Sequence, residues 1–196
     1  MSATARPKPT TSPPEQVLRV ALQLFTEGGY FNTSVPDIVE ASSVSTGSIY
    51  HHFGDKEGIA KQLYASLVER MEAAFDEIEA LHASAHDRCR AVIELLFRMT
   101  EEEPAVMRFM LFSRHREFIP DQKPVCSSRP FVQMREMVKA GMDSGEVVPL
   151  TPVVAASAVF GGALRLMQLR LDGILREPLS VHLEEIWQCA WRSVAP

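Results

Sequence analysis

The stretch that most constrains the fold is residues 33–56, TSVPDIVEASSVSTGSIYHHFGDK, because it encodes two short helices around a tight turn. Ser34 is placed to cap the first helix, and Asp37, three residues later, is placed to complete a capping box. Pro36 suits the first turn of that helix, where a missing N–H donor costs nothing. Ser45 is placed to cap the second helix. The pattern predicts a helix-turn-helix.

The second helix of this pair is polar on all but one side. Ile49 and Phe53 are its expected core residues, while Ile38 and Ala41 are those of the first helix. The residues expected to point outward are Thr46, Gly47, Ser48, Tyr50, His51 and His52. Small and hydrogen-bonding groups of this kind suit a helix that enters a DNA groove, where they approach base edges and grip phosphates. The composition therefore favours a DNA-reading helix.

A characteristic order of residues runs through about positions 15–64. Its members are Ala21, Leu24, Phe25, Gly28, Gly29, Tyr30, Thr33, Ile38, Ala41, Val44, Ser45, Gly47, Ser48, Ile49, Tyr50, His52, Phe53, Lys56 and Glu57. This order closely resembles the TetR family of bacterial repressors. By position, the resemblance implies that the phosphate contacts are made by Thr33, Ser34, Tyr50, His52 and Lys56. It likewise implies that the residues facing DNA bases are Thr46, Gly47, Ser48 and His51.

The resemblance also implies an all-α fold in two domains. Residues 1–14 are rich in Pro, Ser and Thr and are expected to form a disordered tail, and a three-helix DNA-binding domain is expected over 15–55. Residues 56–196 are expected to form a larger ligand-binding and dimerisation domain that opens with a connector helix, 56–81. Proteins of this family are usually repressors that release their operator when a small molecule binds. The implied partners are thus double-stranded DNA and a hydrophobic or aromatic effector, with no cofactor.

Three positions depart from the family pattern. Ser43 stands in the turn between the two helices where glycine is common, so a residue with a side chain must adopt a tight conformation there. Pro36 and Thr46 stand where a polar or basic residue is frequent. Residues 1–60 contain four Lys or Arg and six Asp or Glu, although a basic face is typical of DNA-binding proteins. We therefore expect weak non-specific affinity and a shallow salt dependence.

The C-terminal half has the apolar spacing of five more helices, at 86–101, 104–115, 130–144, 152–172 and 180–194. The segment 116–129 is expected to be irregular. This half is rich in Met and Phe, which line adaptable apolar pockets but also fill helical cores. The candidate pocket residues are Phe97, Met107, Met110, Phe112, Phe131, Met134, Phe160 and Met167.

The last two of these helices carry apolar faces too broad for one small monomer to bury. The candidate dimer-interface residues are Val159, Leu164, Leu171, Ile186, Trp187 and Trp191. Members of the family form homodimers through this pair of helices. A twofold dimer places its recognition helices in successive major grooves about 34–36 Å apart, so a palindromic operator is expected.

The composition favours a cytoplasmic protein. The net charge of −5 argues against general adhesion to nucleic acid or membranes. Three scattered cysteines do not suggest a disulfide framework, so a reducing compartment is expected. Cys126 lies in the predicted irregular segment and is either an inert thiol or a redox sensor. We expect no signal peptide and no apolar run of membrane-spanning length.

Two other classes of function stay open at this point. An enzyme is disfavoured because the sequence contains no GxxxxGK(S/T) phosphate loop, GxSxG elbow, HExxH or paired CxxC motif. His82 and His86 stand four residues apart as candidate metal ligands, but no third ligand accompanies them, so no metal is expected. The other class is a ligand-binding or interaction protein of the same fold whose DNA binding is weak or lost. The acidic balance of residues 1–60 favours that alternative.

Overall fold

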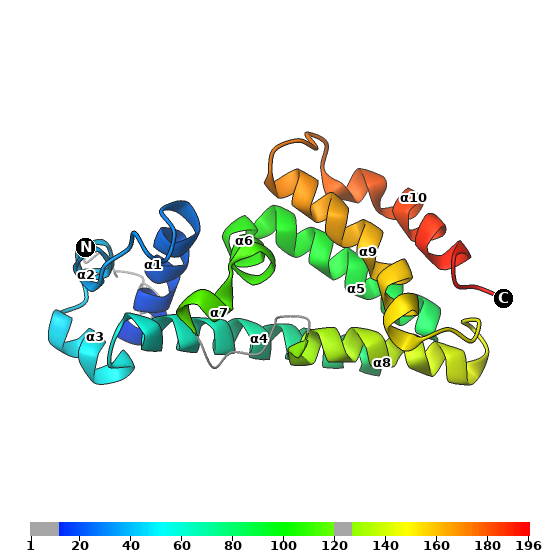
Figure 1. Cartoon of the computed structure of the whole chain (residues 1–196), viewed down its shortest axis with the longest axis horizontal. Helices are drawn as coiled ribbons and strands as arrows, with labels where there is room; N and C mark the ends of the chain where they lie inside the picture. The colour runs from blue at the N-terminus through cyan, green and yellow to red at the C-terminus, as the bar shows by residue number, and fades with distance from the viewer. Residues whose placement is uncertain (1–11, 120–126) are drawn as a thin grey trace, which may run out of the picture. The chain divides into compact units, whose positions relative to one another are not determined.

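The computed structural model describes residues 12–119 and 127–196, which contain helices and no strand (Figure 1). This confirms the predicted all-α fold class. The chain divides into two compact units, the first extending to Tyr64 and the second from Ala65 to Pro196. The division falls inside one long helix, α4 (Lys56–Leu81).

Unit 1 consists of α1 (Pro13–Glu27), α2 (Val35–Ser42), α3 (Thr46–Phe53) and the start of α4. Helix α1 begins earlier than predicted, because Ser12 and Glu15 form a capping box in which the Ser12 N–H donates to Glu15 Oε2 at 2.9 Å. The first turn tolerates two prolines because its N–H groups have no helical acceptor. The predicted tail, 1–14, therefore ends at least two residues too late, and residues 1–11 lie outside the described part of the chain.

The helix-turn-helix forms as its caps predict. The Ser34 N–H donates to Asp37 Oδ2 at 2.7 Å, and the Ser34 hydroxyl accepts from the Asp37 N–H. Ser43 has φ 56°, so a residue with a side chain adopts the left-handed conformation that this tight turn requires and that glycine adopts more easily. One core prediction is wrong, because Ala41 is exposed and its neighbour Ser42 is buried. Ser42 can be buried because its hydroxyl accepts from the Val44 N–H.

Within the described residues, unit 2 contains the rest of α4 and six further helices. These are α5 (Ala85–Glu102), α6 (Pro104–Phe112), α7 (His115–Phe118), α8 (Arg129–Ser144), α9 (Pro152–Leu171) and α10 (Leu179–Arg192). Helices α5, α9 and α10 pack side by side, and α8 contacts both α5 and α9 (Figure 1). The core between them is apolar and includes residues from every one of these helices.

The predicted helix 104–115 is broken at its C-terminal end. Ser113 has extended backbone angles, so α6 stops at Phe112 and a short helix, α7, follows. The break turns His115 inward, where its ring lies 5.0 Å from that of Phe109. Burial lowers the pKa of His115 to about 4, so this residue is neutral at physiological pH.

Cys126 lies outside the described residues. Cys89 is buried, and its burial raises the pKa of the thiol to about 12.

Helix α9 corrects the expectation that no apolar run is of membrane-spanning length. Its 20 residues have a mean hydropathy of 1.4 in their most apolar stretch, which is long and apolar enough to cross a membrane by those two criteria alone. The helix is a packed element of unit 2, in contact with α5, α8 and α10. Only 28% of the stretch is buried, however. In one copy of the chain Val153 and Val154 of α9 are exposed, and Leu164, Leu166 and Leu169 are half-buried.

An ion pair joins α5 to the α9–α10 connection. The Arg170 guanidinium donates to both carboxylate oxygens of Glu101 at 2.9 Å, and the Leu179 N–H donates to Glu101 Oε1 at 2.9 Å. The hydrogen bonds from Arg170 hold the pKa of Glu101 below its ordinary value, outweighing the opposite effect of partial burial. Arg170 also donates to the Arg176 carbonyl oxygen. The pair therefore fixes the start of α10.

Replacing Glu101 by glutamine is expected to lower the free energy of unfolding of unit 2 by about 1–2 kcal/mol at neutral pH. Because the folded pKa is depressed, the contribution is complete above the ordinary carboxyl pKa and is lost as the pH falls through the lower folded value. The difference between the two proteins should therefore be smaller at a pH below the ordinary carboxyl pKa than at neutral pH. Both tryptophans of the chain lie in α10, so their fluorescence during urea unfolding follows unit 2. The matched control is Glu102→Gln at the exposed neighbour; an equal loss at both pH values would show that the charge is not responsible.

Candidate functional site

The outward face of α3 presents the side chains that the sequence predicts. Thr46, His51 and His52 are exposed, and Tyr50 has 50% of its surface exposed. The core residues of this helix, Ile49 and Phe53, are buried as expected. The outward face carries no carboxylate, because none occurs between Thr46 and Phe53. It offers a hydroxyl, a phenol and two imidazoles to whatever it contacts.

The N-terminal end of α3 is shaped for close approach. The Ser45 hydroxyl accepts from the Ser48 N–H at 3.3 Å, which satisfies one of the free donors of the first turn. A Cβ added at Gly47 would meet no atom within 4 Å, so packing inside unit 1 does not require glycine there. The missing side chain instead leaves open space at the surface. The positive end of the helix dipole faces the same space, which favours an anion.

Thr33 is placed differently from the prediction. Only 5% of its surface is exposed, and its hydroxyl donates to the Gly29 carbonyl oxygen at 3.0 Å and to that of Leu24 at 3.3 Å. Its N–H donates to the Tyr30 carbonyl oxygen. A phosphate contact by this side chain would break bonds that hold the turn between α1 and α2. The structure therefore supports a positioning role for Thr33, whereas Ser34 is exposed at the start of α2.

Lys56 is brought against that same turn. Its Nζ donates to the carbonyl oxygens of Tyr30 at 3.0 Å and Thr33 at 2.9 Å, and it lies 4.2 Å from the centre of the Tyr30 ring. An ammonium has three donors, so one remains for a further acceptor. The predicted phosphate contact is compatible with this arrangement. The Lys56 ammonium also holds α4 against the α1–α2 turn through its two hydrogen bonds. The sequence did not predict this role.

The described part of unit 1 contains more acidic than basic residues. Residues 12–64 contain three Lys or Arg and six Asp or Glu. Besides Lys56, Lys61 is engaged, because its Nζ lies 2.7 Å from Glu57 Oε1. Three of the carboxylates line one open groove of about 790 Å³ between α1 and α2, those of Glu27, Asp37 and Glu40. Four of the six acidic residues lie on α1 and α2, and Asp55 and Glu57 follow α3, which itself contains no Lys, Arg, Asp or Glu.

Gly58 is a structural residue that sequence reasoning missed. It lies in the first turn of α4, where the Gly58 N–H donates to Asp55 Oδ1 at 2.7 Å. A Cβ added at Gly58 would lie 1.8 Å from the carbonyl oxygen of Phe53, the last residue of α3. Glycine is therefore needed to seat the end of α3 against α4. The available signal was a glycine in a helix, where it costs about 1 kcal/mol relative to alanine.

The eight candidate pocket residues do not gather at one site. Phe131, Met134 and Phe160 line a groove of about 220 Å³ between α8 and α9. Phe97 lines a separate groove of about 320 Å³ between α5 and α10. The remaining candidates are three methionines of the packed core, Met107, Met110 and Met167, and the partly exposed Phe112. The predicted pocket set thus combines residues of two separate grooves with residues of the core, because core and pocket residues share the same chemistry.

Three of the six candidate interface residues belong to the core of unit 2. Val159, Leu171 and Trp187 are buried within one copy of the chain. Leu164, Ile186 and Trp191 are half-buried. The exposed apolar residues of α9 and α10 are instead Val153, Val154 and Val181, which are 58%, 55% and 66% exposed. Helical spacing identified both helices as unusually apolar, but it did not separate the inward face from the outward one.

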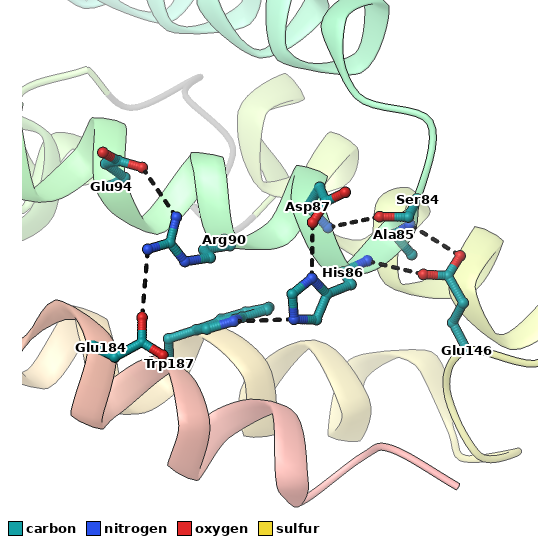
Figure 2. Close-up of polar contacts among 9 residues, drawn as sticks. All are labelled: Ser84, Ala85, His86, Asp87, Arg90, Glu94, Glu146, Glu184 and Trp187. Atoms are coloured by element: carbon teal, nitrogen blue, oxygen red, sulfur yellow. Dashed lines mark hydrogen bonds and ion pairs between the residues drawn. The ribbon is translucent and has the colours of Figure 1, made fainter.

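A polar network fixes the start of α5 against α10 and the α8–α9 connection (Figure 2). Glu146 accepts from the N–H groups of Ala85 at 3.0 Å and His86 at 3.1 Å. The His86 ring pairs with Asp87 through Nδ1 at 2.9 Å and with the Trp187 Nε1–H through Nε2 at 3.3 Å. Both ring nitrogens are thus engaged. Within residues 12–119 and 127–196, no group of three His, Cys, Asp or Glu side chains is arranged as metal ligands.

Known proteins resemble this chain most clearly over unit 1. A family model described as bacterial regulatory proteins of the tetR family matches residues 17–63. Over residues 17–63 this chain is similar to the TetR family. The transcriptional repressor AcnR of Corynebacterium glutamicum is 40% identical over 77 residues, which are 39% of this chain and 40% of AcnR. The regulator HbdR of an Aromatoleum species is 33% identical over 92 residues, 46% of this chain and 40% of HbdR. The chain thus spans about 40% of the length of these relatives.

Solved TetR-family structures resemble the chain over nearly its whole length. A TetR-family regulator from Marinobacter aquaeolei has a TM-score of 0.76 at 22% identity, covering 93% of this chain and 95% of its own. The regulator FadR of Bacillus subtilis, solved in complex with stearoyl-CoA, has a TM-score of 0.72 at 19% identity and covers 89% of this chain and 96% of its own. At these identities the likeness concerns the fold. The second unit therefore resembles these structures in fold alone.

Proposed function

We propose that this protein is a cytoplasmic transcriptional regulator of the TetR family that reads double-stranded DNA through α2 and α3. The observation that carries the proposal is the outward face of α3, which is uncharged, hydrogen-bonding and open at Gly47. The bases are read by Thr46, Gly47, Ser48 and His51, and the phosphates are held by Ser34, Tyr50, His52 and Lys56. Base-edge and phosphate contacts of these two kinds are what a recognition helix needs.

The working form is a homodimer with a palindromic operator. Support comes from α9, whose apolar outward residues Val153 and Val154 stay exposed in a single copy. Apolar surface of this extent favours burial against a second copy. Two recognition helices per dimer also supply the contacts that one acidic unit 1 lacks. A small apolar effector binds unit 2 and lowers the affinity of the dimer for DNA. The DNA affinity falls by the factor by which the effector prefers the DNA-free dimer to the DNA-bound one.

Selection of bound duplexes from a random pool tests this function directly. Enrichment of a palindrome is expected. The logarithm of its binding constant should fall only gradually with the logarithm of the salt concentration, because each neutralised phosphate contributes about 0.9 to that slope. A slope near −10, as for a protein with about ten phosphate contacts, would contradict the proposed mode of binding. Failure to enrich any sequence would favour the other candidate, a ligand-binding protein of this fold without DNA binding, which the acidic balance of unit 1 supports.

Replacing Tyr50 by alanine is expected to weaken binding to all duplexes by about tenfold or more, since a dimer loses two phosphate contacts of about 1 kcal/mol each. Tyr50→Phe should show most of the same loss, because it removes only the hydroxyl. Thr46→Ala, in contrast, should change the selected sequence more than the affinity, since base contacts specify and phosphate contacts position. Fluorescence anisotropy with the selected duplex and a scrambled one measures all three. Intact affinity in Tyr50→Ala would show that α3 does not face DNA as proposed.

A further inference from the structure

His86 joins the start of α5 to α10 through both nitrogens of its ring (Figure 2). The Trp187 Nε1–H donates to His86 Nε2 at 3.3 Å, and His86 Nδ1 lies 2.9 Å from Asp87 Oδ1. The centre of the imidazole also lies 4.9 Å from the ring centres of Trp187 and Trp191, edge-on to each. The two indoles stack on one another at 5.2 Å. One imidazole therefore contacts both tryptophans of the chain.

The hydrogen bond from Trp187 sets the protonation state of His86. An indole N–H is a donor only, so the Nε2 that accepts from it must carry a lone pair. The single ring proton then sits on Nδ1 and is donated to Asp87. A second proton can be added only at Nε2, where it would meet the indole N–H. Protonation of His86 therefore removes the acceptor of Trp187.

The carboxylates around the ring favour that second proton. They come from α5, from the α8–α9 connection and from α10, and are those of Asp87, Glu146 and Glu184 (Figure 2). Glu146 accepts from the backbone N–H of His86 at 3.1 Å. The hydrogen bond from His86 holds the pKa of Asp87 below its ordinary value, so this carboxylate is charged at neutral pH. An imidazolium is stabilised by anions at such short distances.

The cations of the same region are engaged with other partners. Arg90 lies one turn further along α5, and its guanidinium pairs with carboxylates of α5 and α10 at 3.6 and 3.4 Å. Arg88 donates to two carbonyl oxygens at the end of α4 and just after it. The arginines of α9 form hydrogen bonds elsewhere in unit 2. His82, before α5, is the other titratable group that acts on Asp87. The surroundings of His86 are thus negative in balance.

We propose that His86 is a proton-sensitive contact that controls how α10 is held against α5. The neutral ring accepts from Trp187 and holds α10 in place. The protonated ring leaves the Trp187 N–H without an acceptor in a site where only 3% of that residue is exposed, so the indole must move. A proton needs no open pocket, so the contact responds in a single copy or in a dimer. The inference concerns unit 2 alone and does not depend on DNA binding.

Tryptophan fluorescence of the full chain between about pH 8 and pH 5 tests the inference, because histidine ordinarily changes its charge in that range. The parent is compared with Trp191→Phe, which leaves Trp187 as the single tryptophan. Emission is expected to fall as the pH is lowered, because an imidazolium quenches a neighbouring indole more strongly than imidazole does. The acrylamide quenching constant is expected to rise by about twofold or more, since a buried N–H without an acceptor moves toward water.

Three variants identify the responsible group. His86→Gln supplies an amide oxygen that can accept from Trp187 and does not titrate, so both signals should become independent of pH. His182→Gln is the matched control on α10, where the ring lies 3.3 Å from Glu177, and it should keep the transition. Asp87→Asn should move the transition to lower pH, because a carboxylate that favours the imidazolium is removed.

Three outcomes would overturn the inference. The first is unchanged emission and unchanged acrylamide quenching of Trp187 over the whole pH range. The second is the same transition in His86→Gln, because another group would then be titrating. The third is a fall in emission with no rise in acrylamide quenching, because the ring would then be protonated while α10 stays in place. Circular dichroism confirms that each variant is folded, and the comparison of the parent with Asp87→Asn decides the question if His86→Gln is not.

Discussion

A methyl group added at Gly58 is expected to weaken DNA binding by about 30-fold or more and to destabilise unit 1 by roughly 2–3 kcal/mol. Alanine normally stabilises a helix by about 1 kcal/mol relative to glycine. Here its Cβ would lie 1.8 Å from the Phe53 carbonyl oxygen, a backbone atom that cannot rotate away. The steric term is the larger one, so the C-terminal end of α3 must move away from α4. The recognition face then loses its orientation.

Amide hydrogen exchange across α2 and α3 measures this loss of stability, and anisotropy with the selected operator measures the loss of affinity. Gly47→Ala is the matched control, because its added Cβ meets no atom within 4 Å. That variant should keep the exchange protection of α3 and change only DNA recognition. Slower exchange in Gly58→Ala would mean that helix propensity outweighs the clash, and the contact between α3 and α4 would then be looser than the structure indicates.

Replacing Lys56 by methionine is expected to have the second-largest effect. The change keeps the length of the side chain and removes the donor from two part-buried carbonyl oxygens, those of Tyr30 and Thr33. Unit 1 should lose roughly 1–3 kcal/mol of stability, since hydrogen bonds to a charged donor are among the stronger ones. Operator affinity should fall by about tenfold or more. The slope of the logarithm of the binding constant against the logarithm of the salt concentration should become shallower by about 1.8, because the dimer loses two phosphate contacts.

The control for this variant is Lys61→Met, which removes a cation from an exposed pair with Glu57. Exposed pairs contribute little, so stability should change by less than about 0.5 kcal/mol and the salt slope should not change. An unchanged slope in Lys56→Met, together with reduced stability, would show that Lys56 is a clamp alone. An unchanged stability with a reduced slope would show the opposite division of roles.

Local signals in the sequence predicted the helix-turn-helix well. The bonds of Ser34 with Asp37 and the cap at Ser45 join residues three apart, so the pattern that encodes them is visible in a short stretch. The strained φ of Ser43 was likewise expected from its position in the turn. Helix boundaries in the C-terminal half were predicted within a few residues, except where α6 ends early.

The errors concern properties that depend on distant residues. Thr33 is buried because two carbonyl groups of the α1–α2 region accept its hydroxyl, and no local pattern shows that. Val159 lies in the core because α5 and α8 cover the inward face of α9, and Trp187 lies there because α10 packs on α5 and α9. A helix with two apolar faces has an ambiguous periodicity. Phe131 and Phe160 line one groove only because α8 packs on α9.

The uncharged face of α3 has a consequence for how the proposed regulator is distributed in a cell. A genome offers about 10⁶–10⁹ competing non-specific sites, and proteins with strongly basic faces spend most of their time on them. A recognition helix without Lys or Arg gains little electrostatic attraction to the phosphates of these non-specific sites. Most copies should therefore diffuse freely and sample the operator from solution. At a given specific affinity, fewer molecules per cell are then needed to occupy the operator, because fewer are held at non-specific sites.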